Sequence, residues 1–211
     1  MATMRITSSG FGHLQRIPEE YAFGAPDPQT HLRLSSNRNP PLEFSGVPVG
    51  TRSLVLICVD SDVPTRADDV NQEGRSIPAT LPRTSFHHWV MVDLPPGLTG
   101  IAAGSCADGI VARGKRSPPG PAGSRQGLND YTSWFAGDAQ MGGQWFGYDG
   151  PCPPWNDTLL HHYHFLLFAT DLERCPVDGA FTGTEVEAAL VGHVLAEARL
   201  TGTYSLNPSV R

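Results

Sequence analysis

The chain has 211 residues, of which 39% are apolar and only 17% are charged, so it can fold around a packed core and does not resemble a disordered polyelectrolyte. It contains 23 glycines and 19 prolines, which is too many helix breakers for long helices to dominate. Fifteen Lys and Arg residues stand against 21 Asp and Glu, a net charge of −6. This balance lacks the broad basic surface of a nucleic-acid-binding protein, and we predict no nucleic-acid partner.

The N-terminus and the cysteines narrow the class of protein further. The first ten residues have no apolar stretch typical of a secretory signal. The longest apolar run, residues 54–59, is far shorter than the roughly 20 residues of a membrane span. We therefore expect a cytoplasmic protein with no transmembrane segment. No two of the four cysteines form a CxxC motif, which argues against structural zinc, and a reducing compartment argues against disulfides.

Three segments predict the main strands. They cover residues 53–60, 88–94 and 163–169, and each is rich in β-branched or aromatic residues and bounded by Pro, Gly or Asp. The first is apolar throughout, so we expect a strand that is covered on both faces.

Two stretches between these strands, residues 65–86 and 101–144, predict long loops or insertions, because they show little periodicity and many turn residues. The second contains a basic run, residues 113–125. We interpret this run as a solvated loop; the alternative is contact with an acidic partner.

Helical periodicity is clear only near the C-terminus. Thr184 and Glu187 form a capping-box pattern before apolar residues spaced by four, which predicts a helix over about residues 184–197. Residues 200–206 then predict a closing strand.

Polar residues cluster where the predicted strands end or begin. Asp60 and Asp62 follow the first strand, and extended geometry would point both to one side. The simpler alternative is an Asx turn that ends the strand. His87 and His88 precede the second strand, and because adjacent strand residues face opposite ways, only one of them reaches a given pocket.

The third cluster joins a rigid loop to a histidine-rich strand. Residues 150–154 read GPCPP and lead into His161, His162, Tyr163 and His164. A period of two places His161 and Tyr163 on one face and the other two histidines on the opposite face. A His and a Tyr that point together can bind an anion, and the prolines would fix a pocket wall. The alternative is an edge strand with polar residues facing outward.

The sequence gives little support for a metal site or for a catalytic nucleophile. Asp and His residues could in principle hold zinc or iron, but His161 and His164 lie three apart on a predicted strand and face opposite ways. The sequence has no G-x-S-x-G nucleophile elbow and no G-x-x-x-x-G-K-[ST] phosphate loop. We therefore predict no metal, no cofactor and no catalytic residue.

Taken in order, these segments resemble the phosphatidylethanolamine-binding protein family, also called the Raf kinase inhibitor-like family, and most closely its bacterial and archaeal branch. Residues 60–64 (DSDVP) are similar to its D-P-D-x-P motif, and residues 88–90 (HWV) to the start of its H-W-V-x-x-N-I-P block. Residues 147–154 (GYDGPCPP) and 161–163 (HHY) resemble the segment ending in G-P-x-P-P…H-R-Y. The resemblance extends from about residue 5 to residue 206.

The resemblance implies a mainly β fold in a single domain over residues 1–211, with a large antiparallel sheet packed on a smaller sheet and a few peripheral helices. It also implies a small, rigid surface pocket for phosphate or a phosphoethanolamine headgroup. By position, the pocket would consist of Asp60, Asp62, Pro64, His88, Gly150, Pro151, His161 and Tyr163. There His88 and His161 would donate hydrogen bonds to the anion, Tyr163 would add a hydroxyl, and Asp60 or Asp62 would raise the pKa of a histidine.

Several positions depart from the family pattern. Ser61 replaces a proline, His162 replaces the arginine of H-R-Y, and Asp93 stands where Asn is common. Residues 65–86 form a longer insertion than we expect of compact bacterial members, and would cover or reshape the mouth of the pocket.

The sequence leaves three functions open. The first is a non-enzymatic binding protein that holds a small anion or phospholipid headgroup and regulates a partner. The second is a kinase or peptidase inhibitor that acts through the pocket rim and the loops. The third is a hydrolase in which Asp60, His88 and His161 activate water. Bacterial relatives also suggest a homodimer.

Overall fold

The computed structural model describes residues 3–210 and consists mostly of strands. In chain order the elements are β1 (Arg5–Thr7), the 3-10 helix η1 (Glu19–Tyr21), β2 (Gly24–Asp27), β3 (His31–Leu34), β4 (Leu42–Ser45), β5 (Ser53–Pro64), β6 (Arg83–Leu94), β7 (Gly100–Ile101), β8 (Arg125–Gln126), α1 (Tyr131–Trp134), β9 (His161–Thr170), α2 (Gly183–Ala189) and β10 (Val194–Tyr204). The three long strands predicted from apolar runs are β5, β6 and β9.

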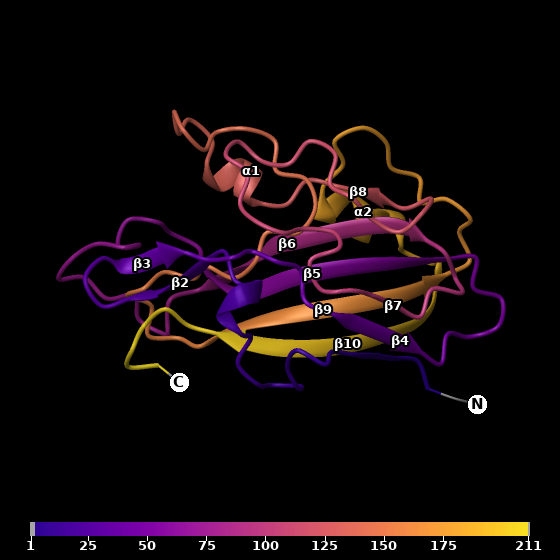
Figure 1. Cartoon of the computed structure of the whole chain (residues 1–211), viewed down its shortest axis with the longest axis horizontal. Coiled ribbons are helices and arrows are strands. Elements are labelled where there is room, and N and C mark those ends of the chain that lie inside the picture. The colour runs from indigo at the N-terminus through magenta and orange to yellow at the C-terminus, as the bar shows by residue number, and fades with distance from the viewer. Residues whose placement is uncertain (1–2, 211) are drawn as a thin grey trace.

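The strands form one large and two small antiparallel sheets. The large sheet has five strands in the order β10-β9-β5-β6-β8, a three-stranded sheet has the order β1-β4-β7, and β2 pairs with β3. The helices α1 and α2 lie with β8 along the β6 side of the large sheet, and the β2–β3 pair projects at one end (Figure 1). This arrangement confirms the expected fold: a mainly β protein with a large sheet, smaller sheets and few helices.

Both faces of β5 are buried over residues 53–60. On one face Leu56 packs in the same core as Ile6 of β1 and Phe44 of β4, so the small sheet covers this side. On the other face Ile57 packs beneath α2 with Val186. The alternation of side chains along a strand sends successive residues into two separate cores, which is why the whole segment is apolar.

The predicted C-terminal helix begins within one residue of its expected start, but its end and its capping residues are wrong. The capping box is formed by Thr182 and Glu185, not by residues 184 and 187: the Thr182 hydroxyl accepts from Glu185 N at 3.4 Å, and a Glu185 carboxylate oxygen accepts from Thr182 N at 2.8 Å. The helix ends at Ala189, a left-handed turn at Gly192 follows, and β10 begins at Val194. Apolar residues spaced by four lie on one face of a helix, but they also lie on one face of a strand, because strand side chains alternate every two residues.

The two predicted loops contain some regular structure. Residues 83–86 belong to β6, and residues 101–144 include β8 and α1. The basic run is not simply solvated: Lys115 Nζ lies 2.6 Å from a carboxylate oxygen of Asp149, and Arg125 Nε lies 2.6 Å from Asp93. Within residues 3–210 no helix is both long and apolar enough to cross a bilayer.

Candidate functional site

A cavity of about 380 Å³ opens where three strands meet. The C-terminal end of β5 lies between the N-terminal ends of β6 and β9, because both neighbours run antiparallel to it. Their polar side chains Asp60, His88, His161 and Tyr163 therefore converge on one floor. These residues include the strand-end clusters that the sequence singled out.

A chain of alternating charges crosses this floor. Asp60 Oδ2 lies 2.7 Å from Nδ1 of His161, whose Nε2 lies 3.1 Å from Asp157 Oδ2. Arg83 Nη2 in turn donates to Asp157 Oδ1 at 3.0 Å. With each carboxylate next to a cation, the formal charges of the four groups sum to zero.

His161 is protonated in this chain, because both of its ring nitrogens face carboxylate oxygens. Burial opposes its charge, but the charge of Asp60 and the hydrogen bonds to Asp157 and Asp60 outweigh burial and raise the pKa of His161 to about 9. The predicted effect of a carboxylate on a histidine is thus confirmed for Asp60. The expected role of His161 as an anion donor is wrong, because both N–H groups are already used within the protein.

His88 presents an acceptor to the cavity. Its Nδ1 donates to the backbone carbonyl oxygen of Asp149 at 2.8 Å, which fixes the tautomer. Burial lowers the pKa of His88, and the charge of Asp60 offsets this only in part. The ring is therefore neutral at pH 7 and carries its free lone pair on Nε2, so its expected role as a donor is also wrong.

The Tyr163 hydroxyl lies beside the Asp60 carboxylate. Its side chain is fully buried, and among residues 3–210 no atom meets this hydroxyl with regular hydrogen-bond geometry. Burial raises the pKa of Tyr163 well above its usual value, and the charge of Asp60 and a side-chain hydrogen bond to it add to the effect, so the proton stays on the oxygen. A buried hydroxyl without a partner costs on the order of 1–3 kcal/mol, which a ligand that bonds to it would recover.

The neighbouring carboxylate Asp62 does not line the cavity. A bulge between Asp60 and Val63 turns Asp62 toward the opposite face, where its Oδ2 accepts from the backbone nitrogen of His162 at 2.8 Å and lies 2.9 Å from that residue's Nδ1. The expectation that Asp60 and Asp62 point to one side is therefore wrong. An Asx-type bond is present instead, since Asp62 N donates to Asp60 Oδ1 at 2.8 Å.

The proline-rich segment supports the cavity from behind. The Gly150 carbonyl accepts from the Tyr131 hydroxyl at 2.9 Å, and the Pro151 carbonyl accepts from Phe23 N at 2.9 Å. Neither Gly150 nor Pro151 lines the cavity, whereas the next three residues, 152–154, do. Part of the predicted wall, residues 152–154, therefore lines the cavity, whereas the two residues of this run predicted as site residues lie behind it.

The walls above the floor are mainly apolar. They come from β3, from residues 63–71 and from residues 131–141, and include Leu34, Val70, Trp134 and Met141. Leu34 and Trp134 are about half exposed, at 60% and 48%, and so form the rim. The insertion at residues 65–82 thus contributes to the mouth, and Asn71 joins it to the proline-rich segment by accepting from Trp155 N at 3.0 Å.

Sequence reasoning missed several residues that organise the floor. Asp157 and Arg83 complete the charge chain, Tyr131 lines the cavity, and Asp149 orients His88. The only hint in the sequence was the position of Asp157, four residues before His161 and in the run between the prolines and the strand. In the part of the chain that the structure describes, no group of three His, Cys, Asp or Glu side chains is arranged to hold a metal ion.

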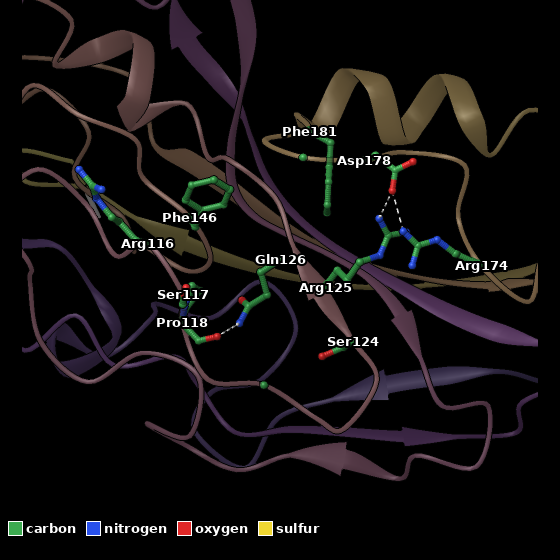
Figure 2. Close-up of a pocket in the computed structure, with 12 residues that line it drawn as sticks. Arg116, Ser117, Pro118, Ser124, Arg125, Gln126, Phe146, Arg174, Asp178 and Phe181 are labelled. Carbon is green, nitrogen blue, oxygen red and sulfur yellow. Dashed lines mark hydrogen bonds and ion pairs between the residues drawn. The ribbon is translucent and has the colours of Figure 1, made fainter.

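A second cavity, of about 460 Å³, lies between β8, residues 116–120 and residues 174–181. It contains three arginines, but Asp178 sits between two of them (Figure 2) and lies 2.6 Å from Arg174 Nη2 and 3.5 Å from Arg125 Nη1. Arg125 also donates to Asp93 and to the carbonyl of Cys175. None of the predicted site residues lines this arginine cleft, so the cavity at the strand ends is the better candidate site.

The fold and the site together define a mainly β protein with a cavity at one end of its large sheet. Comparison with known proteins identifies the family. Residues 7–205 match the family model described as phosphatidylethanolamine-binding protein. The chain belongs to this family.

Relatives and solved structures agree with this assignment. A UPF0098 protein of Methanothermobacter thermautotrophicus is 31% identical over 201 residues, which cover 95% of this chain and 98% of the relative. YbhB of Escherichia coli is 28% identical, over 96% of this chain and 100% of the relative. The crystal structure of Escherichia coli YbcL, described as a new member of the mammalian PEBP family, superposes with a TM-score of 0.69 at 26% identity and covers 97% of this chain and 99% of its own.

Proposed function

We propose that this protein is a non-enzymatic binding protein that holds the phosphate-bearing headgroup of a small amphiphile in the cavity at the strand ends. The observation that carries the proposal is the division of the cavity into a polar floor and apolar walls. A few fixed polar groups orient a ligand, and apolar walls supply much of the binding free energy. The cavity volume of about 380 Å³ suits a headgroup together with the first part of its apolar chain.

The family description, which refers to phosphatidylethanolamine, supports a headgroup of this class. The Tyr163 hydroxyl supplies a donor for a phosphate oxygen. The rim residues Leu34 and Trp134 would contact the apolar part of the amphiphile. A ligand held in this way reaches the surface at the rim, where a partner protein could sense whether the cavity is filled.

The hydrolase alternative is the weaker one, because the floor lacks a competent base next to a nucleophile. His161 is already protonated between two carboxylates and cannot accept a proton at neutral pH. His88 has a free lone pair, but its Nδ1 is bonded to a backbone carbonyl and not to a carboxylate that would stabilise its charged form.

The test is calorimetric titration of wild-type protein with a lyso-phosphatidylethanolamine of short acyl chain and with phosphoethanolamine. We expect both to bind, and the amphiphile to bind more tightly because it also buries apolar surface. Trp134→Ala should weaken the amphiphile and leave the headgroup nearly unchanged, while Tyr163→Phe should weaken both. Val191→Ala, at an exposed site remote from the cavity lining, is the matched control. Binding of neither compound would contradict the proposal.

A further inference from the structure

Two histidines of β9 share the face of the large sheet that does not line the cavity. His162 and His164 lie two residues apart on the strand, so their side chains point to the same side. Their rings are within 11° of parallel, with centroids 6.4 Å apart. Both residues are partly exposed. Imidazole nitrogens are common ligands of transition metals, and two of them side by side on a strand can chelate one ion.

One nitrogen of each ring is already held by an oxygen atom. Nδ1 of His162 lies 2.9 Å from Oδ2 of Asp62, and Nδ1 of His164 lies 2.9 Å from Oγ1 of Thr201. A carboxylate can only accept, so His162 carries a proton on Nδ1 and, when neutral, a lone pair on Nε2. The Thr201 hydroxyl can accept in the same way. Histidines that bind metals almost always donate their other N–H to such a partner, which orients the ring.

The second nitrogen of each ring is accessible to an ion. Within residues 3–210, Nε2 of His162 makes no hydrogen bond, and Nε2 of His164 is hydrogen-bonded only to the exposed Ser61 hydroxyl, at 3.1 Å. Water can replace that single contact at the surface. Nitrogen ligands lie about 2.0–2.1 Å from zinc, so rotation of these partly exposed rings would bring both Nε2 atoms onto one ion.

From this geometry we infer that His162 and His164 form a surface chelate for Zn²⁺, bound through the two Nε2 atoms. Within residues 3–210 no third His, Cys, Asp or Glu side chain completes a ligand set, so water fills the remaining positions. Imidazole favours zinc over hard cations such as Mg²⁺, which prefer oxygen. The Asp62 carboxylate adds negative charge beside the pair, while Arg199 of β10 faces Glu197 at 3.8 Å.

Calorimetric titration with zinc chloride at about pH 7.5, where imidazole is mostly neutral, tests the chelate. We expect His162→Gln and His164→Gln each to raise the dissociation constant of the tightest zinc ion at least about tenfold, because the second imidazole binds intramolecularly. His193→Gln, which removes an exposed histidine elsewhere, should leave it unchanged. Wild-type affinity in either β9 variant, or competition by an excess of Mg²⁺, would overturn the inference. The proposed function would stand, because it does not involve this face.

Asp62 acts as a positioning residue through the ring of His162. Asp62→Ala should weaken zinc binding by about tenfold, the lower end of the effect of removing such a partner. Asp62→Asn keeps an oxygen that accepts from Nδ1–H and should restore most of the affinity, which a general loss of stability would not explain. Equal affinity in wild type and Asp62→Ala would overturn this role.

A crystal of the wild-type protein soaked in zinc chloride gives a readout that requires no variant to fold. We expect an anomalous peak between Nε2 of His162 and Nε2 of His164. Zinc bound only at other histidines would overturn the inference.

Discussion

The carboxylates around His161 make the stability of the fold depend on pH. The pKa of this histidine rises from its ordinary 6.5 to about 9 in the folded protein. Each pKa unit corresponds to about 1.4 kcal/mol, so the protonated form contributes on the order of 3 kcal/mol to the free energy of unfolding. Because the folded pKa is raised, this contribution is complete below about pH 6.5 and is lost as the pH rises to about 9 and beyond.

The assay is urea denaturation of wild type and His161→Gln at pH values between about 6 and 10. The glutamine is neutral at every pH and still supplies polar atoms between Asp60 and Asp157. Other titrating groups contribute to both proteins, so the difference between the two unfolding free energies isolates His161. This difference should shrink by about 3 kcal/mol across the range.

His193→Gln provides the control. This histidine is exposed and lies 2.8 Å from one carboxylate, that of Asp171. Exposed ion pairs contribute little, so the variant should be within about 1 kcal/mol of wild type at every pH. A wild-type curve that stays parallel to that of His161→Gln over the whole range would refute the reasoning about the charge chain.

Three further predictions concern the support of the site. A Cβ added at Gly150 would lie 2.1 Å from the backbone oxygen of Tyr21, so Gly150→Ala should lower the free energy of unfolding in urea by about 1–3 kcal/mol or more. Gly97 has open space around it, and Gly97→Ala should change this free energy by less than about 0.5 kcal/mol. The Asp93 carboxylate accepts from Arg125 Nε at 2.6 Å and from the backbone nitrogen of Cys175 at 2.6 Å. We expect Asp93→Ala to lower the free energy of unfolding by about 3–5 kcal/mol in the same assay. A change near zero would be evidence against this pairing. Cys152 lines the cavity, and its low-dielectric surroundings raise the pKa of its thiol to about 12. Mass spectrometry should therefore show slow alkylation by iodoacetamide at neutral pH in the folded protein and fast alkylation in denaturant, and equal rates would contradict the raised pKa.

Much of the fold was predictable because its local signals agree with its tertiary structure. The apolar run of β5 predicted a strand covered on both faces, and both faces are indeed covered. The alternation of His87 and His88 was also predictable from strand geometry: His88 lines the cavity, while His87 contacts Asp130 and Glu187 on the other side. These features depend only on the period of a strand.

The remaining features depend on pairings that the sequence does not encode locally. Arg83 reaches Asp157 across 74 positions, and no spacing rule indicates that contact. The bulge that separates Asp60 from Asp62 is an irregularity in the pairing of β5 with β6, and no local pattern indicates it. The roles of the histidines could not be assigned before their partners were known, because a neutral His88 accepts a hydrogen bond where a protonated one would donate it.

The most direct test of the proposed site is a crystal structure of the protein grown with phosphoethanolamine. We predict that its phosphate lies on the floor of the cavity, with one oxygen within hydrogen-bond distance of the Tyr163 hydroxyl. Phosphate bound only in the arginine cleft of Figure 2, beside Arg116 and Arg174, would contradict the assignment of the headgroup to the strand ends.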